Sequence, residues 1–483
     1  MSVPNSLRCL LRPSTATTTS IPRRIVSVAV FAASFSSSSI LAKSPMAAKP
    51  KIPSGKAAKI LASGHIRAGK KMQLGKFKKS KNLDRSRPPA PGERKAYRKR
   101  VTLSNNNALP VEGLEAMSAE ALVDPAKVGR MLALPNELVD QLRAVEAFKA
   151  TQTWNMFRQP SMLQRKEARE LAEKMQKAAG KGETLKLVIS GDRLVGKSML
   201  LLQAISYAYL NNWIVLHVPE GQDLTNASTE YAPLPDTTPT QYSQQAYALR
   251  MLQALRKANQ QLLFDLKTVL PHPDLVQHFP VGTSVLQLAN AAKEADTTWP
   301  IFSAVLQELT VEGHGRPPIL FSLDGLSFIM KMSEYRSPAY ELVHAHDLAI
   351  VRRFVDLLSG KTKLPSGGAV IAATTRGNSP RNPSMELAIA RQEAAQGLIK
   401  EAPVREPYSK KYDDRAEGVL SNFEVLKLKS VSRSEARSLM EYWAASGLLR
   451  TAVDEQAVSD KWILGGNGNL GEMERATLLT MRF

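Results

Sequence analysis

The chain has 483 residues, of which 43% are hydrophobic, and a formal net charge of +21. All of this excess charge lies in residues 1–100, which hold 23 Lys and Arg but two acidic residues, so the rest of the chain is formally neutral. The one cysteine, Cys9, lies near the N-terminus, which excludes disulfides, Cys-ligated zinc and a thiol nucleophile from the remainder. No apolar run reaches the roughly 18 residues that a membrane span requires, so we expect no membrane-spanning helix.

Residues 1–42 have the composition of a mitochondrial transit peptide. The first 40 residues contain four arginines and many Ser and Thr, without any Asp or Glu. A secretory signal would need a longer apolar stretch after a compact basic start. The alternative is an ordinary disordered N-terminus. We therefore predict import into the mitochondrial matrix.

Residues 43–110 form a basic arm. Between 43 and 100 there are 19 Lys and Arg against Asp84 and Glu93, so this segment has too little apolar surface to fold alone. A charge run is commonly a solvated tail, but this density favours an anionic partner, either RNA or a lipid surface. We expect an arm that becomes ordered by contacting folded RNA.

Residues 111–180 are predicted to form a helical lead-in to the next domain. Asp140–Ala150 and Met162–Ala179 place apolar residues at helical spacing among charges. Pro160 and Ser161 are suited to break and cap these helices, and Gly180 to Gly182 end the second one.

Gly191–Ser198 reads G-x-x-x-x-G-K-S, the pattern of a phosphate-binding loop. Glycines let the backbone wrap closely around phosphates and direct its N–H groups at them. Leu185–Ile189 before the loop suits a buried strand, and Ser198–Leu210 after it suits a buried helix whose N-terminus faces the phosphates. The predicted nucleotide-binding residues are Gly191, Asp192, Arg193, Leu194, Val195, Gly196, Lys197, Ser198 and Met199.

Further strands and helices alternate after the loop. The expected elements are a strand at Trp213–Val218, a polar surface loop at Gly221–Thr240, and helices at Gln244–Leu266, Ile301–Leu309 and His346–Leu358. Ile319–Asp324 is an apolar strand that ends in an acid, the Walker B pattern, and Gly368–Thr375 is a further strand. Buried strands that alternate with helices predict a parallel α/β sheet over residues 181–400, with the ligand at the strand C-termini. Asp324 and Ser198 are the predicted Mg²⁺ ligands.

Residues 401–483 are predicted to form a helical C-terminal lid. The segment 377–420 is polar, so we expect it to be irregular. Ser432–Ser446 begins with a capping-box pattern, in which Glu435 follows Ser432 by three residues. Leu470–Thr480 is the last expected helix.

Residues from about 150 to 480 resemble the mitochondrial small-ribosomal-subunit GTP-binding proteins, the death-associated protein three family. The residues that carry this resemblance are Ser190–Ser198, Trp213–Glu220, the segment Asn226–Ala232, Leu323–Gly325, and Gly465–Asn467 before Glu472–Arg475. The resemblance implies an AAA+-like P-loop domain with a helical lid, part of the head of the mitochondrial small subunit, that binds GTP or GDP with Mg²⁺. It also implies other mitoribosomal proteins as neighbours and one copy per ribosome. The basic arm lies outside the region of resemblance, and its own charge predicts small-subunit ribosomal RNA as its partner.

Binding is better supported than hydrolysis. Active AAA+ enzymes follow the Walker B Asp with a Glu, but Gly325 follows Asp324 here, and Ser327 breaks the GTPase pattern D-x-x-G. A guanine-selective N-K-x-D motif is absent, so ATP stays open as the ligand. Glu220 is the best substitute base, although it is as readily a solvated carboxylate. Arg376 and Arg475 are arginine-finger candidates by position alone.

The sequence therefore favours a structural ribosomal protein that binds nucleotide and hydrolyses it slowly at most. Bound nucleotide would stabilise the folded domain. The first alternative is a mitochondrial AAA+-type NTPase that remodels a protein or RNA partner, and the second is an RNA-binding factor that visits the ribosome transiently.

Overall fold

The computed structural model describes residues 101–479 apart from residues 236, 274, 378, 410 and 450. It also describes the backbone of two short antiparallel strands, β1 (Ile66–Arg67) and β2 (Lys70–Lys71). The chain divides into two units, Met1–Asp84 and Arg85–Phe483, and the elements from β3 onward belong to the second. The predicted transit peptide and the rest of the predicted arm up to residue 100 lie outside the described residues.

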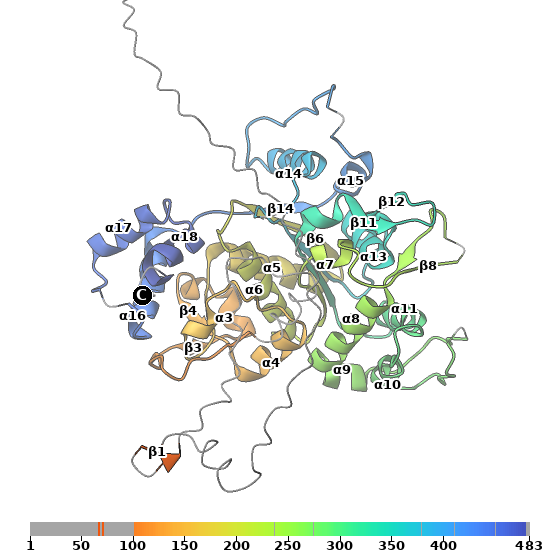
Figure 1. The fold of residues 1–483 in the computed structure, drawn as a ribbon, viewed down its shortest axis with the longest axis horizontal. Helices are drawn as coiled ribbons and strands as arrows, with labels where there is room; N and C mark the ends of the chain where they lie inside the picture. Colours follow the sequence, from red (N-terminus) through yellow and green to blue (C-terminus); the bar gives the residue numbers. More distant parts are fainter. Residues whose placement is uncertain are drawn as a thin grey trace, which may run out of the picture. The chain divides into compact units, whose positions relative to one another are not determined.

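A five-stranded parallel sheet forms the centre of the second unit (Figure 1). Its strand order is β14-β6-β13-β10-β7, so one strand separates the strand before the phosphate loop from the strand that ends in Asp324. The strands are β6 (Thr184–Gly191), β7 (Ile214–Val218), β10 (Ile319–Asp324), β13 (Gly368–Ala373) and β14 (Glu424–Leu428). Asp324 is in register with Ala373, and Ala373 with Ile189, so the strand ends meet at one edge. This confirms the predicted α/β class with a parallel sheet.

Helices cover both faces of this sheet because alternate strand residues point to opposite sides. Along β6, Leu187 and Ile189 join a core with α5 (Lys166–Lys181) and α6 (Lys197–Leu210). Val188 belongs instead to the core on the other face, with α8 (Gln245–Ala258), α11 (Thr298–Leu309) and α13 (Ala349–Ser359). Both faces are therefore buried, which explains why the central strands are mainly apolar.

The lead-in over 111–180 is not all helical, contrary to the prediction. It contains a three-stranded sheet in the order β3-β4-β5, in which β4 pairs antiparallel with β5. Strands of two or three residues are too short to show a period in the sequence. The elements of this segment are β3 (Glu115–Ala116), α3 (Ala119–Val123), a 3₁₀ turn at Pro125–Lys127, β4 (Met131–Ala133), α4 (Asn136–Ala144), a 3₁₀ turn at Trp154–Met156, β5 (Ser161–Leu163) and α5.

The segment between β7 and β10 departs from the prediction at two places. The expected surface loop contains a short helix, α7 (Gln222–Thr225), in which Leu224 is fully buried. The expected long helix is divided at Asn259, whose side-chain amide donates to the Leu255 carbonyl at 3.1 Å in competition with the helix backbone. The elements here are α7, β8 (Ala232–Pro233), β9 (Tyr242–Ser243), α8, α9 (Gln260–Asp265), α10 (Val285–Asn290) and α11.

After β10 the chain forms a hairpin and returns to the sheet. The expected helix at 346–358 begins at Ala349 instead, because His346 belongs to a 3₁₀ turn that follows a short strand. The elements are α12 (Leu326–Ile329), β11 (Met332–Arg336), β12 (Leu342–His344), the 3₁₀ turn Ala345–Asp347, α13 and β13.

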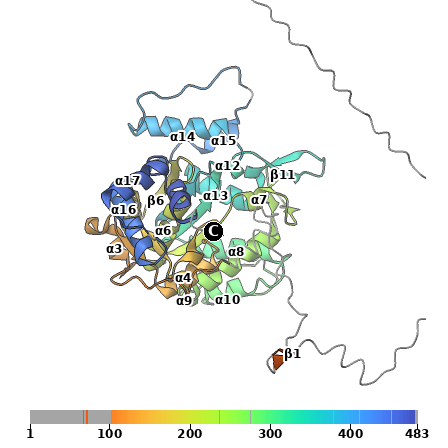
Figure 2. The same cartoon turned by 60° about the vertical axis from the view of Figure 1, so that its left-hand side comes forward.

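The C-terminal part contains helices where irregular chain was expected, and one strand of the main sheet. The segment 377–420 forms α14 (Pro383–Ala395) and α15 (Asp414–Val419). Residues 424–428, inside the range predicted as a helical lid, are the edge strand β14. The helices that follow share a separate core and group together in both views (Figures 1 and 2). They are α16 (Arg433–Ala445), which has the predicted capping box, α17 (Glu455–Leu464), α18 (Leu470–Glu474) and a π-helical turn at Arg475–Leu479.

Candidate nucleotide-binding site

The predicted phosphate loop joins β6 to α6. Gly191 has φ +144°, and a Cβ there would lie 2.5 Å from the Leu428 carbonyl oxygen, so no other residue fits between the loop and β14. Lys197 and Ser198 begin α6, which places its N-terminal N–H groups at the loop. Strand, loop and helix therefore follow one another as the motif requires.

The Lys197 ammonium is turned toward its own loop. It donates to the carbonyl oxygens of Gly191 at 2.9 Å and Asp192 at 2.5 Å. Burial, followed by repulsion from Arg376, lowers the pKa of Lys197 to about 8, although Asp324 and Asp192 oppose the shift. A bound phosphate would replace these carbonyl oxygens with charged acceptors, which form stronger hydrogen bonds to an ammonium.

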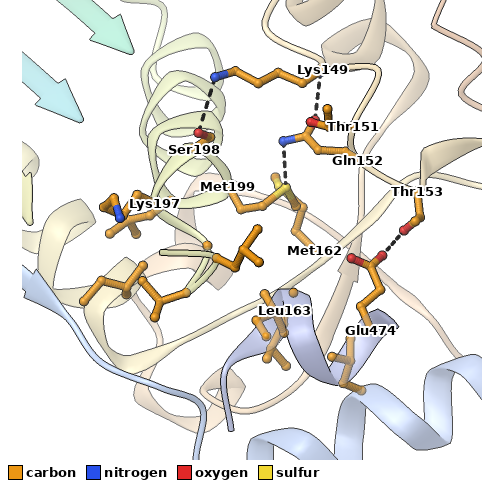
Figure 3. A pocket seen from close by; sticks show the side chains of 18 of the residues that line it. Lys149, Thr151, Gln152, Thr153, Met162, Leu163, Lys197, Ser198, Met199 and Glu474 are labelled. Carbon is orange, nitrogen blue, oxygen red and sulfur yellow. Dashed lines mark hydrogen bonds between the residues drawn. The ribbon is translucent and has the colours of Figure 1, made fainter. Parts of the chain in front are cut away.

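Ser198 and Asp324 meet as predicted. The Ser198 hydroxyl donates to Asp324 Oδ2 at 2.6 Å, and the Asp324 side chain is 3% exposed at the end of β10. A hydroxyl and a carboxylate are hard oxygen ligands of the kind that Mg²⁺ prefers, so these two residues suit the ion. Lys149 is a third member of this cluster, because its ammonium forms an ion pair with Asp324 Oδ2. The same ammonium lies 3.5 Å from Ser198 Oγ (Figure 3).

A cavity of about 570 Å³ opens beside the loop. Its walls come from the loop and α6, from the lead-in between 149 and 165, and from the C-terminal helices. Six cationic side chains line it, namely Lys149, Arg165, Arg193, Lys197, Arg376 and Arg475, together with one carboxylate, Glu474. Its apolar wall includes Trp154, Phe157, Leu439, Tyr442 and Trp443. This lining suits a ligand that combines an anionic end with a flat apolar part.

The predicted residues do not all reach this cavity. Arg193 to Met199 line it, whereas Gly191, Asp192 and Asp324 are not among its lining residues. Glu220 follows β7, and the next residue, Gly221, donates its N–H to the Asp324 carbonyl at 2.7 Å. The backbone next to Glu220 is therefore bonded to the end of β10, but Glu220 is not among the residues that line the cavity.

The two arginine candidates lie at the cavity with partners of their own. Arg376 pairs with the exposed Asp192 at 3.2 Å, and Arg475 with Glu472 at 3.0 Å. Thr374, the residue directly after β13, donates its hydroxyl to the Ile189 carbonyl of β6.

Sequence reasoning missed the residues that the lead-in contributes. Gln152 donates to Met199 Sδ at 3.3 Å, and Thr153 bonds Glu474 across the cavity (Figure 3). Arg165 is buried and donates to the Val195 carbonyl at 3.1 Å and to the Lys429 carbonyl at 2.8 Å. No short motif marks these side chains, because tertiary contacts alone bring them to the loop.

The C-terminal helices contact the phosphate loop through its backbone. The Asn469 side-chain amide donates to the Arg193 carbonyl at 2.7 Å, and the Gly471 N–H donates to the Leu194 carbonyl at 3.0 Å. Leu194, with φ +64°, has a left-handed conformation that is rare for a residue with a side chain. These two bonds, called the loop latch below, fasten the start of α18 to the site.

Comparison with known proteins agrees with this architecture. The family model described as mitochondrial ribosomal death-associated protein 3 matches residues 162–476, from β5 through the sheet and the site to the end of α18. The small ribosomal subunit protein mS29 of Neurospora crassa is 51% identical over 486 residues, which cover 100% of both chains. The chain belongs to the mitochondrial ribosomal death-associated protein 3 family.

Membership of the family confirms the resemblance that the loop, the strand Trp213–Val218 and the Asn226–Ala232 segment predicted. It also confirms the predicted location in the mitochondrial matrix. Of the helices in the described part of the chain, none combines the length and the apolar character that crossing a bilayer would demand.

Proposed function

We propose that this protein is a structural component of the small subunit of the mitochondrial ribosome, in its head, and that it binds a guanine nucleotide with Mg²⁺ in the cavity beside the phosphate loop. The ribosomal part is supported by the relative named small ribosomal subunit protein mS29, which matches over its full length. The nucleotide part is carried by one observation: the loop, with Lys197 and Ser198, lines a cavity with six cationic side chains, and Ser198 donates to the Asp324 carboxylate.

The proposed ligand lies between three parts of the chain. Lys197 and the N–H groups of α6 would hold the phosphates, Ser198 and Asp324 would hold the metal ion, and the aromatic wall would hold the base. The loop latch and Arg165 join the same three parts around the cavity. A ligand bound there stabilises the assembled state over any state in which the C-terminal helices detach. Its nucleotide is GTP or GDP by family resemblance, with ATP as the alternative.

The site favours binding over turnover. Gly325, directly after Asp324, has φ +91°, and a Cβ there would lie 3.1 Å from Phe328 and 3.4 Å from the Gly221 nitrogen. A glutamate at this position would be strained by the left-handed backbone. The glutamate that activates water in AAA+ enzymes therefore has no place directly after Asp324. Glu220 is the one candidate base that we retain, and hydrolysis is slow at most.

Other partners follow from the family and the charge of the arm. The basic arm over 43–110 contacts small-subunit ribosomal RNA through its phosphates, and other mitoribosomal proteins surround a single copy of the chain. The arm contact is electrostatic, so it weakens as salt is raised.

Sedimentation of mitochondrial extracts in high salt tests this proposal, with the native chain compared to Lys197→Ala. We expect the native chain to migrate with the small subunit and the variant to be depleted from it. Nucleotide released by denaturing the purified subunit is identified by chromatography, and guanine nucleotide should be absent from subunits that carry the variant. A native chain that runs as a free oligomer would instead support the remodelling NTPase. Equal retention of both chains, with equal nucleotide content, would refute the nucleotide site.

A further inference from the structure

The Asp324 carboxylate is already neutralised by a cation from the same chain. Asp324 is 3% exposed, and the Lys149 ammonium forms an ion pair with its Oδ2 atom. Ser198 Oγ donates to the same oxygen and lies 3.5 Å from the Lys149 nitrogen. A buried carboxylate without a positive partner is strongly unfavourable, so Lys149 stabilises the protein when the cavity holds no ligand.

Lys149 contacts the same two oxygens that suit a metal ion. An ammonium and a divalent cation that share these oxygens would lie a few ångströms apart, where like charges repel. The side chain of Lys149 is therefore incompatible, in its present position, with a metal ion on Ser198 and Asp324. We propose that Lys149 is a built-in cation that occupies the metal position of the ligand-free protein and withdraws when a metal–nucleotide complex binds.

Lys149 is placed so that its side chain can leave while its backbone stays. Its N–H donates to Gln152 Oε1 at 2.8 Å, and the preceding residue, Phe148, is 2% exposed and packs edge-on against Trp154 at 5.3 Å. The side chain itself is 22% exposed, so it borders the cavity and has room to turn. A flexible four-carbon stem carries the ammonium as a compact point charge, so exchange requires no change of fold.

Two consequences follow. Without ligand, loss of the Lys149 charge should destabilise the protein and expose Asp324 to metal ions from solution. With ligand, loss of this charge should lower the Mg²⁺ concentration that binding requires, because no internal cation competes. The second consequence rests on the nucleotide site proposed above, whereas the first needs no nucleotide.

Thermal unfolding of the full chain without nucleotide tests the first consequence. Lys149→Met keeps the length of the side chain but removes its charge, and its midpoint in EDTA should fall by about 5 °C. Titration with MgCl₂ should restore the midpoint of K149M but leave that of the native chain unchanged. The matched control is Lys361→Met, which removes a lysine that is 63% exposed and 3.9 Å from Asp356. K361M should behave as the native chain in both conditions.

The double variant K149M/D324N separates charge from packing. It should recover the midpoint lost in K149M and lose the response to MgCl₂, because the buried carboxylate is gone. This comparison also decides the case in which K149M does not fold: a folded double variant supports the proposal, and an unfolded one overturns it. Equal midpoints of K149M and the native chain in EDTA, or an equal response of both to MgCl₂, would also overturn it.

Calorimetric binding of GDP at a series of Mg²⁺ concentrations tests the second consequence. K149M should reach half of its maximal affinity at a Mg²⁺ concentration about tenfold lower than the native chain. An unchanged or higher requirement would contradict the exchange of Lys149 with metal. If the native chain bound no GDP at any Mg²⁺ concentration, the proposed function would fail, and the nucleotide-free measurements would still decide the role of Lys149.

Discussion

Removing the side-chain half of the loop latch should weaken nucleotide binding. Asn469→Ala deletes the bond from the Asn469 amide to the Arg193 carbonyl, which is 2.7 Å long. It also deletes the helix cap of α18, since Asn469 Oδ1 accepts the Glu472 N–H at 3.4 Å. A net hydrogen bond contributes about 1 kcal/mol and an N-cap about 1 kcal/mol, so we expect about 2 kcal/mol in total.

Only part of this loss of stability lowers the affinity for nucleotide. If nucleotide binds the state in which the C-terminal helices are latched, the affinity falls by the loss of population of that state. A loss of about 2 kcal/mol sets an upper limit of roughly 30-fold in the dissociation constant. The assay is calorimetric titration of the full chain with GDP and Mg²⁺, together with thermal unfolding.

Asp454→Ala is the matched control for this variant. Asp454 caps α17 in the same group of helices, accepting the Ala457 N–H at 2.8 Å. D454A should therefore lose about 1 kcal/mol of stability while GDP affinity stays unchanged. Equal GDP affinities for N469A and D454A would refute the role of the latch in binding.

Further predictions concern three charged groups, Lys197, His346 and Glu308. The folded-state pKa of Lys197 is about 8, so GDP affinity should decline as pH rises through this value, and calorimetric titrations that give the same affinity on both sides of it would contradict this expectation. Without ligand, the low pKa of Lys197 means that the unfolded chain binds more protons than the folded one above about pH 8. The free energy of unfolding should therefore increase from pH 8 up to 10.5, the ordinary pKa of lysine. Burial lowers the pKa of His346 from 6.5 to about 3, so acid should destabilise the fold progressively below pH 6.5, and His346→Gln should flatten this part of a chemical-denaturation series. Glu308 is fully buried and accepts from Arg316 at 2.9 Å and from the Leu270 N–H at 2.8 Å, so Glu308→Ala should cost about 3–5 kcal/mol in urea unfolding, a loss that an unchanged midpoint would contradict.

The parts of the fold that were predicted correctly carry local signals. The strand before the loop, the helix after it and the strand ending in Asp324 are each continuous in sequence, and their residue types follow from burial on both faces of a parallel sheet. The capping box of α16 likewise depends on residues three positions apart. In such segments, local sequence and tertiary environment favour the same structure.

The parts that were missed depend on contacts between distant residues. Strand β14 contains two charged residues among its five, without a strict alternation, and pairing with β6 makes Glu424–Leu428 a strand rather than part of a helical segment. Lys149 is 175 positions from Asp324, and an isolated lysine after Phe148 has no pattern that indicates its partner. Asn469 and Gly471 act through backbone carbonyls of the loop, which sequence does not distinguish from any others.

The position of β14 has a consequence for how the domain is completed. The strand β6 lies between β13 and β14, and β14 is the last of the five strands in the chain. During synthesis, which proceeds from the N-terminus, β6 can pair with β13 before β14 exists. The other edge of β6 then keeps unpaired N–H and C=O groups, which are prone to pair with other chains. The residues that cover this edge are followed directly by α16 to α18, the helices that fasten to the phosphate loop. The same C-terminal segment therefore covers the free edge of β6 and completes the wall of the cavity. A chain truncated before Glu424 would expose an edge strand that is prone to aggregate, and it would lack part of the proposed ligand site.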